Sequence, residues 1–167
     1  MWEKIRTLFR SHPERLKIAE FLLRNGLSIR DDKIWMNEIQ VPVLNVARVA
    51  GVDRRTVNET MRVINANKEL KIIYTNLESA GPSLRAAAKH LGLGVLEITA
   101  DDPARAGILA NASKVLAEEG ISIRQALVDD PELSPHPKLT LIGDRLIPGK
   151  AISLILKVPG VAKVSVS

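Results

Sequence analysis

The 167-residue sequence contains no cysteine and few aromatic residues. The absence of cysteine excludes disulfides and thiolate metal sites, and it is typical of proteins in reducing compartments such as the cytoplasm. With two Trp, one Tyr and two Phe, the hydrophobic cores must be built mainly from Val, Ile, Leu and Ala. We therefore expect a cytoplasmic protein with aliphatic cores.

Long hydrophobic runs and catalytic motifs are also absent. No apolar run approaches the ~20 residues that a membrane-spanning helix requires, and the charged start of the chain, MWEKIRTLFR, does not resemble a signal peptide. The three His residues lie in unrelated segments, at positions 12, 90 and 136, and neither metal-ligand spacing nor a phosphate-binding glycine motif occurs. The sequence therefore predicts no membrane association, no metal or other cofactor, and no enzyme.

Positive charge is unevenly distributed along the chain. Residues 1–92 carry 16 Lys and Arg against 10 Asp and Glu, a net charge of +6, whereas residues 93–167 carry 8 against 9, a net charge of −1. Affinity for nucleic acid comes largely from Lys and Arg that displace counterions from phosphates. Solvated helix surfaces would give a similar modest surplus, so charge alone leaves both interpretations open.

A segment in the N-terminal half predicts two helices joined by a tight turn. It reads VLNVARVAGVDRRTVNETMRVI, with apolar residues at helical spacing on both sides of Gly51. Ala47 is small enough for close helix contact, Gly51 permits the chain to reverse, and Asp53 is a typical N-cap. We expect helices over 43–50 and 54–66, forming a helix-turn-helix whose second helix enters the DNA major groove.

The segments around this motif indicate a small mixed unit. Apolar spacing predicts two helices before it, and an extended pattern predicts a hairpin between those helices and the motif. The expected elements are a helix over 2–10, a helix from Pro13 to about Asn25, a hairpin over 34–41 turning near Asn37, and either a strand or a short helix over 70–75.

The second helix of the motif carries the candidate DNA contacts. Arg pairs with guanine and Asn with adenine in the major groove, whereas cations beside the helix contact phosphates and position the protein without reading sequence. The alternative is a helical pair that contacts protein, which Glu59 favours because a carboxylate repels phosphates. The predicted base-reading residues are Arg54, Arg55, Thr56, Asn58 and Arg62, and the predicted phosphate contacts are Arg48 and Lys68.

The C-terminal half reads as strand, helix, strand, strand, helix, strand. This order predicts a ferredoxin-like sandwich, an antiparallel four-stranded sheet with two helices on one face. The fold class is therefore α+β, with a helix-turn-helix domain over 1–75, a connector helix within 76–92 and a second domain over 93–167. The expected elements are strands over 94–100, 121–128, 138–143 and 161–166, and helices over 83–91, 108–119 and 150–157.

Three segments of the C-terminal half resemble the ACT domain, a small-molecule sensor common in amino-acid metabolism. They read DDPARAGIL from Asp101, LAEEGISI from Leu116 and PGV from Pro159. The chain departs from the family pattern at Ala106, where Pro is usual, and at Ser122, where Asn is usual. Together the two halves resemble archaeal proteins described as predicted regulators of amino-acid metabolism, with GVDRRTVNET and SLRAAAKHLGLG as the closest segments.

The loop that follows the first strand of this half is the candidate ligand site. Backbone N–H groups at a helix N-terminus attract a carboxylate, Gly107 permits close approach, and Asp101 or Asp102 would accept an ammonium group. Alternatively, these carboxylates only cap the helix and turn the chain. The ACT resemblance implies a pocket across a homodimer interface, so that Ser122 and Gln125 belong to the other subunit. The predicted ligand-binding residues are Asp101, Asp102, Ala104, Arg105, Ala106, Gly107, Ile108, Ser122 and Gln125.

Two functions follow from these observations. The first is a ligand-responsive, homodimeric transcriptional regulator, in which an amino acid or related metabolite bound to the ACT-like domain controls DNA binding. The second is a metabolite sensor that binds a metabolic enzyme instead of DNA, with the N-terminal half as a protein-interaction module.

Overall fold

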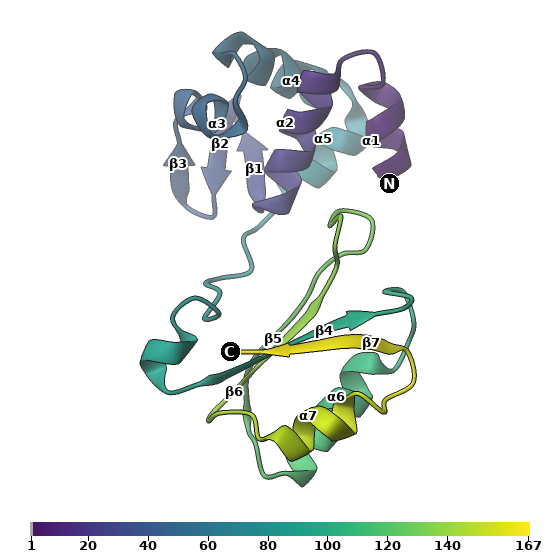
Figure 1. The fold of residues 1–167 in the computed structure, drawn as a ribbon. Helices are drawn as coiled ribbons and strands as arrows, with labels where there is room; N and C mark the ends of the chain where they lie inside the picture. The colour runs from purple at the N-terminus through teal and green to yellow at the C-terminus, as the bar shows by residue number, and fades with distance from the viewer. Residues whose placement is uncertain (1) are drawn as a thin grey trace. The chain divides into compact units, whose positions relative to one another are not determined.

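The computed structural model describes residues 2–167, which form two compact units that meet in sequence between Gly81 and Pro82 (Figure 1). Each unit contains helices and one antiparallel sheet, so the predicted α+β class is confirmed. The sequence places the boundary near residue 92. The structure divides the chain earlier, because residues 84–93 contribute to the hydrophobic packing of the C-terminal unit.

Over residues 2–81, the N-terminal unit combines five helices with a three-stranded sheet of order β1-β2-β3. The predicted hairpin is confirmed, since Ile34 pairs with Val41 and Met36 with Ile39 on either side of its turn. The elements are α1 (Trp2–Leu8), α2 (Pro13–Arg24), β1 (Leu27–Arg30), β2 (Lys33–Met36), β3 (Ile39–Val41), α3 (Val43–Ala50), α4 (Arg54–Ala66) and α5 (Lys68–Thr75).

Local signals account for α3, α4 and the turn between them. Gly51 adopts the left-handed conformation with φ of 66°, and the Val52 N–H donates to the Ala47 carbonyl at 3.0 Å, which closes α3. The Asp53 carboxylate accepts the Arg55 N–H at 2.6 Å and so caps α4. Both helices have the bounds that the sequence predicts.

The core of the N-terminal unit holds these helices against the sheet. Ile18, Ile34, Val57 and Ile64 are fully buried. Tyr74 on α5 is also buried, and its hydroxyl donates to the Ala19 carbonyl at 3.0 Å. Desolvation, assisted by the nearby Glu20 carboxylate, raises the pKa of Tyr74 well above its usual range, so this phenol stays a neutral donor.

The C-terminal unit has the predicted order of strands and helices. Its four-stranded antiparallel sheet has the order β5-β6-β4-β7, the arrangement of a ferredoxin-like sandwich. The elements are a 3₁₀ helix η1 (Ala88–Leu91), β4 (Gly94–Ala100), α6 (Ile108–Glu118), β5 (Ile123–Val128), β6 (Leu139–Gly143), α7 (Gly149–Ile155) and β7 (Val161–Val166).

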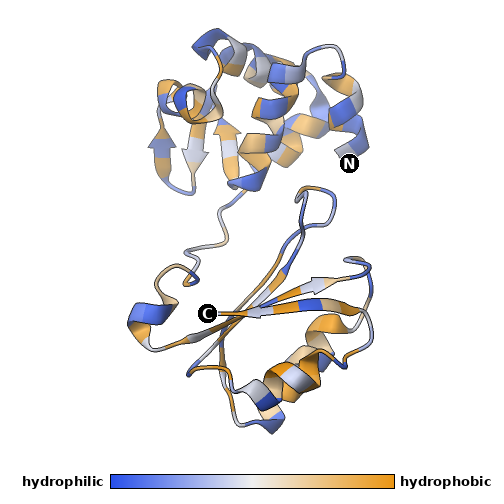
Figure 2. Ribbon diagram, viewed as in Figure 1, coloured by the Kyte–Doolittle hydropathy of each residue, from blue (hydrophilic) through white to orange (hydrophobic). Residues whose placement is uncertain are grey.

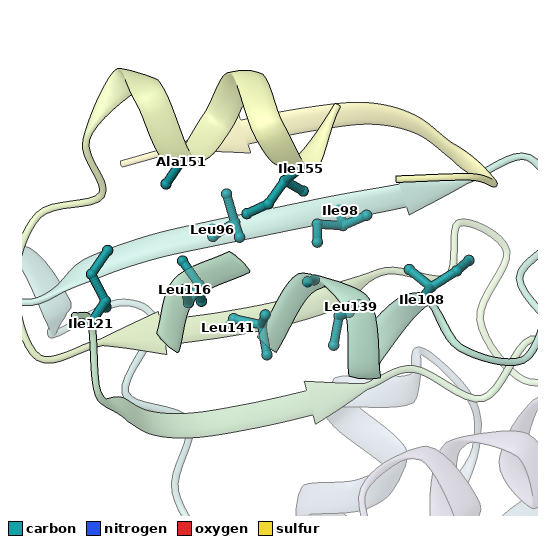
Figure 3. Packing of buried hydrophobic residues seen from close by; sticks show 10 residues of the cluster. Leu96, Ile98, Ile108, Leu116, Ile121, Leu139, Leu141, Ala151 and Ile155 are labelled. Carbon is teal, nitrogen blue, oxygen red and sulfur yellow. The ribbon is translucent and has the colours of Figure 1, made fainter. Parts of the chain in front are cut away.

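Both helices of this unit pack on one face of its sheet. Leu116 of α6 and Ile155 of α7 meet Leu96, Ile98 and Leu141 of the central strands, and all five side chains are almost completely buried (Figure 3). Apolar residues are correspondingly dense in α6 and α7 (Figure 2). Because β5 lies at the sheet edge, its helix-side residue Val128 remains 63% exposed.

The predicted connector helix over 83–91 is wrong. Only η1 is helical there, and Ala88 and Leu93 pack with Val95 and Ile142 on the sheet face opposite α6 and α7. The alanine-rich sequence has high helix propensity, but burial of these residues against the sheet overrides it. The segment therefore covers part of the second sheet face instead of forming a separate rod.

Candidate functional site

Four exposed arginines on α3 and α4 are here called the arginine surface: Arg48 in the last turn of α3, Arg54 and Arg55 in the first turn of α4, and Arg62 further along α4. The opposite side of α4 is buried through Val57, Met61 and Ile64, which fixes the outward direction of Arg55 and Arg62. Within residues 2–167, none of the four forms an ion pair with a carboxylate. Their charges therefore remain available to an anionic partner.

Glu59, the one carboxylate on the exposed side of α4, is paired. It accepts a hydrogen bond and ion pair from Arg15 of α2. This pairing offsets the charge that would repel phosphates, so the objection to a DNA-binding surface loses weight. Arg15 thereby becomes a supporting residue that sequence spacing did not indicate.

Three further residues were predicted to contact DNA. Thr56 and Asn58 lie on α4 with the arginines, whereas Lys68 lies apart from them. Thr56 and Asn58 are half-buried on α4, and the Thr56 carbonyl accepts the Thr60 hydroxyl at 2.7 Å. Lys68 begins α5, beyond the C-terminal end of α4, and α4 itself extends about 18 Å from Arg54 to Ala66. It therefore does not belong to the arginine surface.

Lys17 on α2 joins the arginine surface although sequence analysis did not select it. Its Nζ lies 3.7 Å from the position that a Cβ on Gly51 would occupy, so its charge sits at the turn between α3 and α4. The side chain is exposed, and within the described residues no carboxylate pairs with it. The packing of α2 against α3 and α4 brings Lys17 to this position. Sequence analysis did not select it because no local motif predicts this packing.

A cavity of about 190 Å³ lies at the other candidate site, wholly within the C-terminal unit. It is enclosed by the loop after β4, the start of α6 and the ends of β5 and β6. Of the predicted ligand-binding residues, three line it: Arg105, Gly107 and Ile108. The remaining lining residues are Ile98, Ala100, Pro103, Leu109, Val128, Asp129, Pro137, Lys138 and Leu139.

The start of α6 has no side-chain cap. Gly107 occupies the N-cap position with φ of 94°, and no side chain accepts a hydrogen bond from the first turn. The alternative that Asp101 or Asp102 caps this helix and turns the chain is therefore wrong for the cap and confirmed for the turn, which Asp102 forms. Asp102 instead accepts the Ala104 N–H at 2.9 Å and shapes the loop, and Asp101 donates its N–H to the Gly160 carbonyl at 3.0 Å. Neither lines the cavity, nor do Ala104 and Ala106.

Ser122 and Gln125 do not reach the cavity within one chain. Ser122 precedes β5 and exchanges hydrogen bonds with Asp144, at the opposite end of that strand from Val128. Gln125 pairs with Ile142 in the sheet and binds Pro82 and Leu84 on the face opposite the helices. Residues Val128 and Asp129 line the cavity instead, which the antiparallel pairing of Val128 with Leu139 explains.

The cavity combines an apolar wall with opposite charges. Arg105 lies against Gly160, where an added Cβ would stand 2.6 Å from the Arg105 Cδ. Asp129 supplies a carboxylate whose Oδ2 accepts the Lys138 N–H at 3.2 Å. An uncapped helix N-terminus beside a cation attracts a carboxylate. The arrangement suits a small molecule that carries both charges and an apolar group.

Two kinds of site are not found in the described part of the chain. Residues 2–167 contain no group of three or more His, Cys, Asp or Glu side chains placed to hold a metal ion. None of the helices within the same range is long and apolar enough to cross a membrane.

Comparisons with known proteins add little to this geometry. No protein-family model matches the chain, and no curated protein matches it either. Among solved structures, a glycine-to-threonine mutant of Rv3291c is similar at 14% identity and a TM-score of 0.27, covering 92% of this chain and 89% of that one. A transcriptional regulator from Neisseria meningitidis in complex with L-Met is similar at 11% identity and a TM-score of 0.26, covering 92% and 86%. Superpositions this loose establish nothing about the site.

Proposed function

We propose that the protein is a ligand-responsive transcriptional regulator of amino-acid metabolism that acts in the cytoplasm. In this proposal the N-terminal unit is a helix-turn-helix DNA-binding domain and the C-terminal unit is an ACT-type sensor. The observation that carries it is the presence in one chain of an unpaired arginine surface on an exposed helix and a small charged cavity at an uncapped helix N-terminus. No catalytic step and no cofactor is assigned to the chain.

The arginine surface supports the DNA-binding half of the proposal. Arg54 and Arg55 stand in the first turn of α4, where recognition helices make their base contacts. Arg forms bidentate hydrogen bonds with guanine, each worth ~1–3 kcal/mol of discrimination. Lys17 and Arg48 lie beside the turn and are suited to phosphate contacts, which position the helix without reading sequence.

The cavity supports the sensing half. Its volume of about 190 Å³ is below the ~300 Å³ at which sites for drug-sized ligands begin, so it suits a metabolite of amino-acid size. In the proposed complex Arg105 and the α6 N-terminus bind the carboxylate, and Asp129 accepts the ammonium group. Ile98, Ile108 and Leu139 would contact an apolar side chain.

A homodimer through the C-terminal unit completes the proposal. Strand β5 is a sheet edge with one side unpaired within the chain. Val128 on this edge is 63% exposed, and Leu109 at the start of α6 is 41% exposed. Pairing of the β5 edges of two subunits would cover this apolar surface. The two DNA-binding units of the dimer would then bind two half-sites.

A gel shift against upstream regions of the source genome tests the DNA-binding half. The double variant Arg54→Ala with Arg55→Ala should abolish specific binding. The matched control, Lys33→Ala with Lys71→Ala, removes the same charge from exposed positions of the same unit and should still shift DNA. If the arginine variant binds as well as wild type, the recognition-helix assignment is wrong.

A thermal-shift screen of the common amino acids tests the sensing half. A ligand that raises the unfolding temperature of wild type should lose its effect in Gly107→Val, since Gly107 lines the cavity. If the ligand still raises the unfolding temperature of Gly107→Val, the loop between β4 and α6 is not part of the ligand site.

One observation favours a second function, a metabolite sensor that binds a metabolic enzyme instead of DNA. On α3, Val49 is 72% exposed beside the turn that leads into α4, and Leu44 at the start of the helix is 55% exposed. Contiguous exposed apolar patches mark protein contacts, and this alternative requires Leu44 and Val49 to belong to one. Under this alternative, Val49→Asp would abolish enzyme binding, and the arginine variant would leave it unchanged.

A further inference from the structure

The chain that leaves the N-terminal unit is held to that unit as far as Ser79. The Asn37 side chain accepts the Ser79 N–H at 2.9 Å through Oδ1, and its Nδ2 lies 3.5 Å from the Ser79 carbonyl oxygen. The backbone of Glu78 also passes so close to Gly26 that a Cβ there would lie 2.6 Å from the Glu78 carbonyl oxygen. Ser79 is therefore fixed by contacts within its own unit.

The chain that enters the C-terminal unit is held from Pro82 onward. The Gln125 side chain accepts the Leu84 N–H at 2.9 Å and donates to the Pro82 carbonyl at 2.7 Å. One residue further, Arg85 pairs with Glu97 at 2.8 Å, and Glu97 is only 15% exposed. One side-chain amide in each unit thus binds the backbone on its own side of the junction.

Only Ala80 and Gly81 lie between these two anchors. Within the described chain neither residue takes part in a backbone hydrogen bond, and a Cβ on Gly81 would have no neighbour within 4 Å. Gly81 also has φ of 98°, a conformation that other residues rarely adopt. Freedom between the two anchors is therefore concentrated in two residues, which span at most ~7 Å.

We propose that Asn37 and Gln125 are clamps that restrict the hinge between the units to Ala80 and Gly81, and that the Gln125 clamp responds to the ligand. The response rests on the proposed sensing function. Gln125 lies on β5 three residues before Val128, which lines the cavity about 10 Å away along the strand. A ligand that shifts the Val128 end of β5 also moves Gln125. The backbone of Pro82 and Leu84, which Gln125 binds, then moves with it.

Hydrogen exchange resolved at single amides by NMR tests the clamps without any ligand or DNA. In wild type, the N–H groups of Ser79 and Leu84 should exchange slowly and those of Ala80 and Gly81 quickly. Asn37→Gly removes the first clamp while keeping the left-handed backbone at that position (φ 54°) and should accelerate exchange at Ser79 about tenfold, with Leu84 unchanged. Gln125→Leu removes the second clamp and should accelerate exchange at Leu84 about tenfold, with Ser79 unchanged.

Gln40→Leu is the matched control for Gln125→Leu. It removes an exposed strand glutamine of the N-terminal unit and should change exchange at neither amide. Slow exchange at Ala80 and Gly81 in wild type, or unchanged exchange at Leu84 in Gln125→Leu, would overturn the clamp assignment. Folding is checked in the same spectra by the protection of the β4 and β6 amides for Gln125→Leu, and by the protection of the β1 and β2 amides for Asn37→Gly and Gln40→Leu.

The response to ligand is tested by the same exchange experiment with a mixture of the common amino acids as the probe. The mixture should raise the unfolding temperature and change exchange at Leu84 at least threefold in wild type, with no change at Ser79. If the unfolding temperature rises while Leu84 is unaffected, the clamp is not regulated although the sensing function stands. If neither quantity changes, the sensing function fails and the regulated clamp with it.

Discussion

The two units bury similar aliphatic cores but treat their surface charges differently. In the C-terminal unit, Glu97 pairs with both Arg85 and Lys138, and Glu119 pairs with Lys150. In the N-terminal unit, the arginine surface lacks such partners within the described residues, and Glu59, the carboxylate on the exposed side of α4, is paired with Arg15. The difference marks the arginine surface as positive charge that is left for a partner.

The comparison extends to the helix termini. In the N-terminal unit the start of α4 is capped by the Asp53 carboxylate, so a second anion there would be repelled. In the C-terminal unit the start of α6 is uncapped and faces the cavity. A free anionic ligand is therefore expected at α6, whereas α4 is suited to contacts through its side chains.

The largest expected effect tests whether the units are independent. Leu116→Ala removes a fully buried side chain from the C-terminal core, and Ile64→Ala does the same in the N-terminal core. Each should lower the free energy of unfolding of its own unit by about 2–5 kcal/mol. Chemical denaturation followed by amide resonances of each unit should show one shifted transition per variant. A shift of both transitions in either variant would contradict independence.

A smaller effect is expected at the cavity. Gly160→Ala places a Cβ 2.6 Å from the Arg105 Cδ at a backbone φ of 93°, so it displaces the Arg105 side chain. We expect affinity for the stabilising amino acid to fall about tenfold, matching the loss of one charge-assisted hydrogen bond. Isothermal titration measures this loss. The control, Gly120→Ala, has an equally left-handed φ of 68° with no neighbour at the added Cβ, and should leave affinity unchanged.

The contrast between the capped start of α4 and the uncapped start of α6 can be tested directly. Asp53→Ala should lower the free energy of unfolding of the N-terminal unit by about 1 kcal/mol, because it removes the cap of α4. Asp102→Ala in the C-terminal unit should cost less than about 0.5 kcal/mol, because Asp102 is exposed and caps no helix. Equal losses, measured by urea denaturation, would show that capping does not distinguish the two helices.

The smallest expected effect concerns Glu59. Glu59→Gln removes the carboxylate from the α4 surface and should tighten DNA binding up to about fivefold, whereas Arg15→Ala leaves Glu59 unpaired and should weaken it by a similar factor. Fluorescence anisotropy at two salt concentrations measures both. The two variants must change DNA affinity in opposite directions. A change in the same direction would mean that the Arg15–Glu59 pair affects DNA binding only through folding.

Local sequence signals predicted much of this architecture. The bounds of α3 and α4 follow from helical spacing, Gly51 and the Asp53 cap, all within a few residues of one another. Strand β4 follows from apolar alternation, and its bounds are as predicted. The hairpin of β2 and β3 follows from an extended pattern around Asn37, whose φ of 54° suits the turn.

Features that depend on packing between distant segments were not predictable. Strand β1 was missed because three consecutive residues, Leu27, Ser28 and Ile29, are buried and therefore do not alternate. The path of residues 82–93 depends on Gln125 and on burial of Ala88 against the sheet. The cavity depends on sheet register, which brings Val128 and Leu139 beside the loop after β4.

The central claim is that a ligand in the C-terminal unit changes DNA binding by the N-terminal unit. The direct measurement is the DNA dissociation constant with and without the amino acid that raises the unfolding temperature, in wild type and in Arg105→Ala. We expect a change of at least fivefold in wild type and no change in Arg105→Ala, whose affinity for DNA in the absence of the amino acid should equal that of wild type. An identical dissociation constant with and without a bound amino acid in wild type would contradict the account.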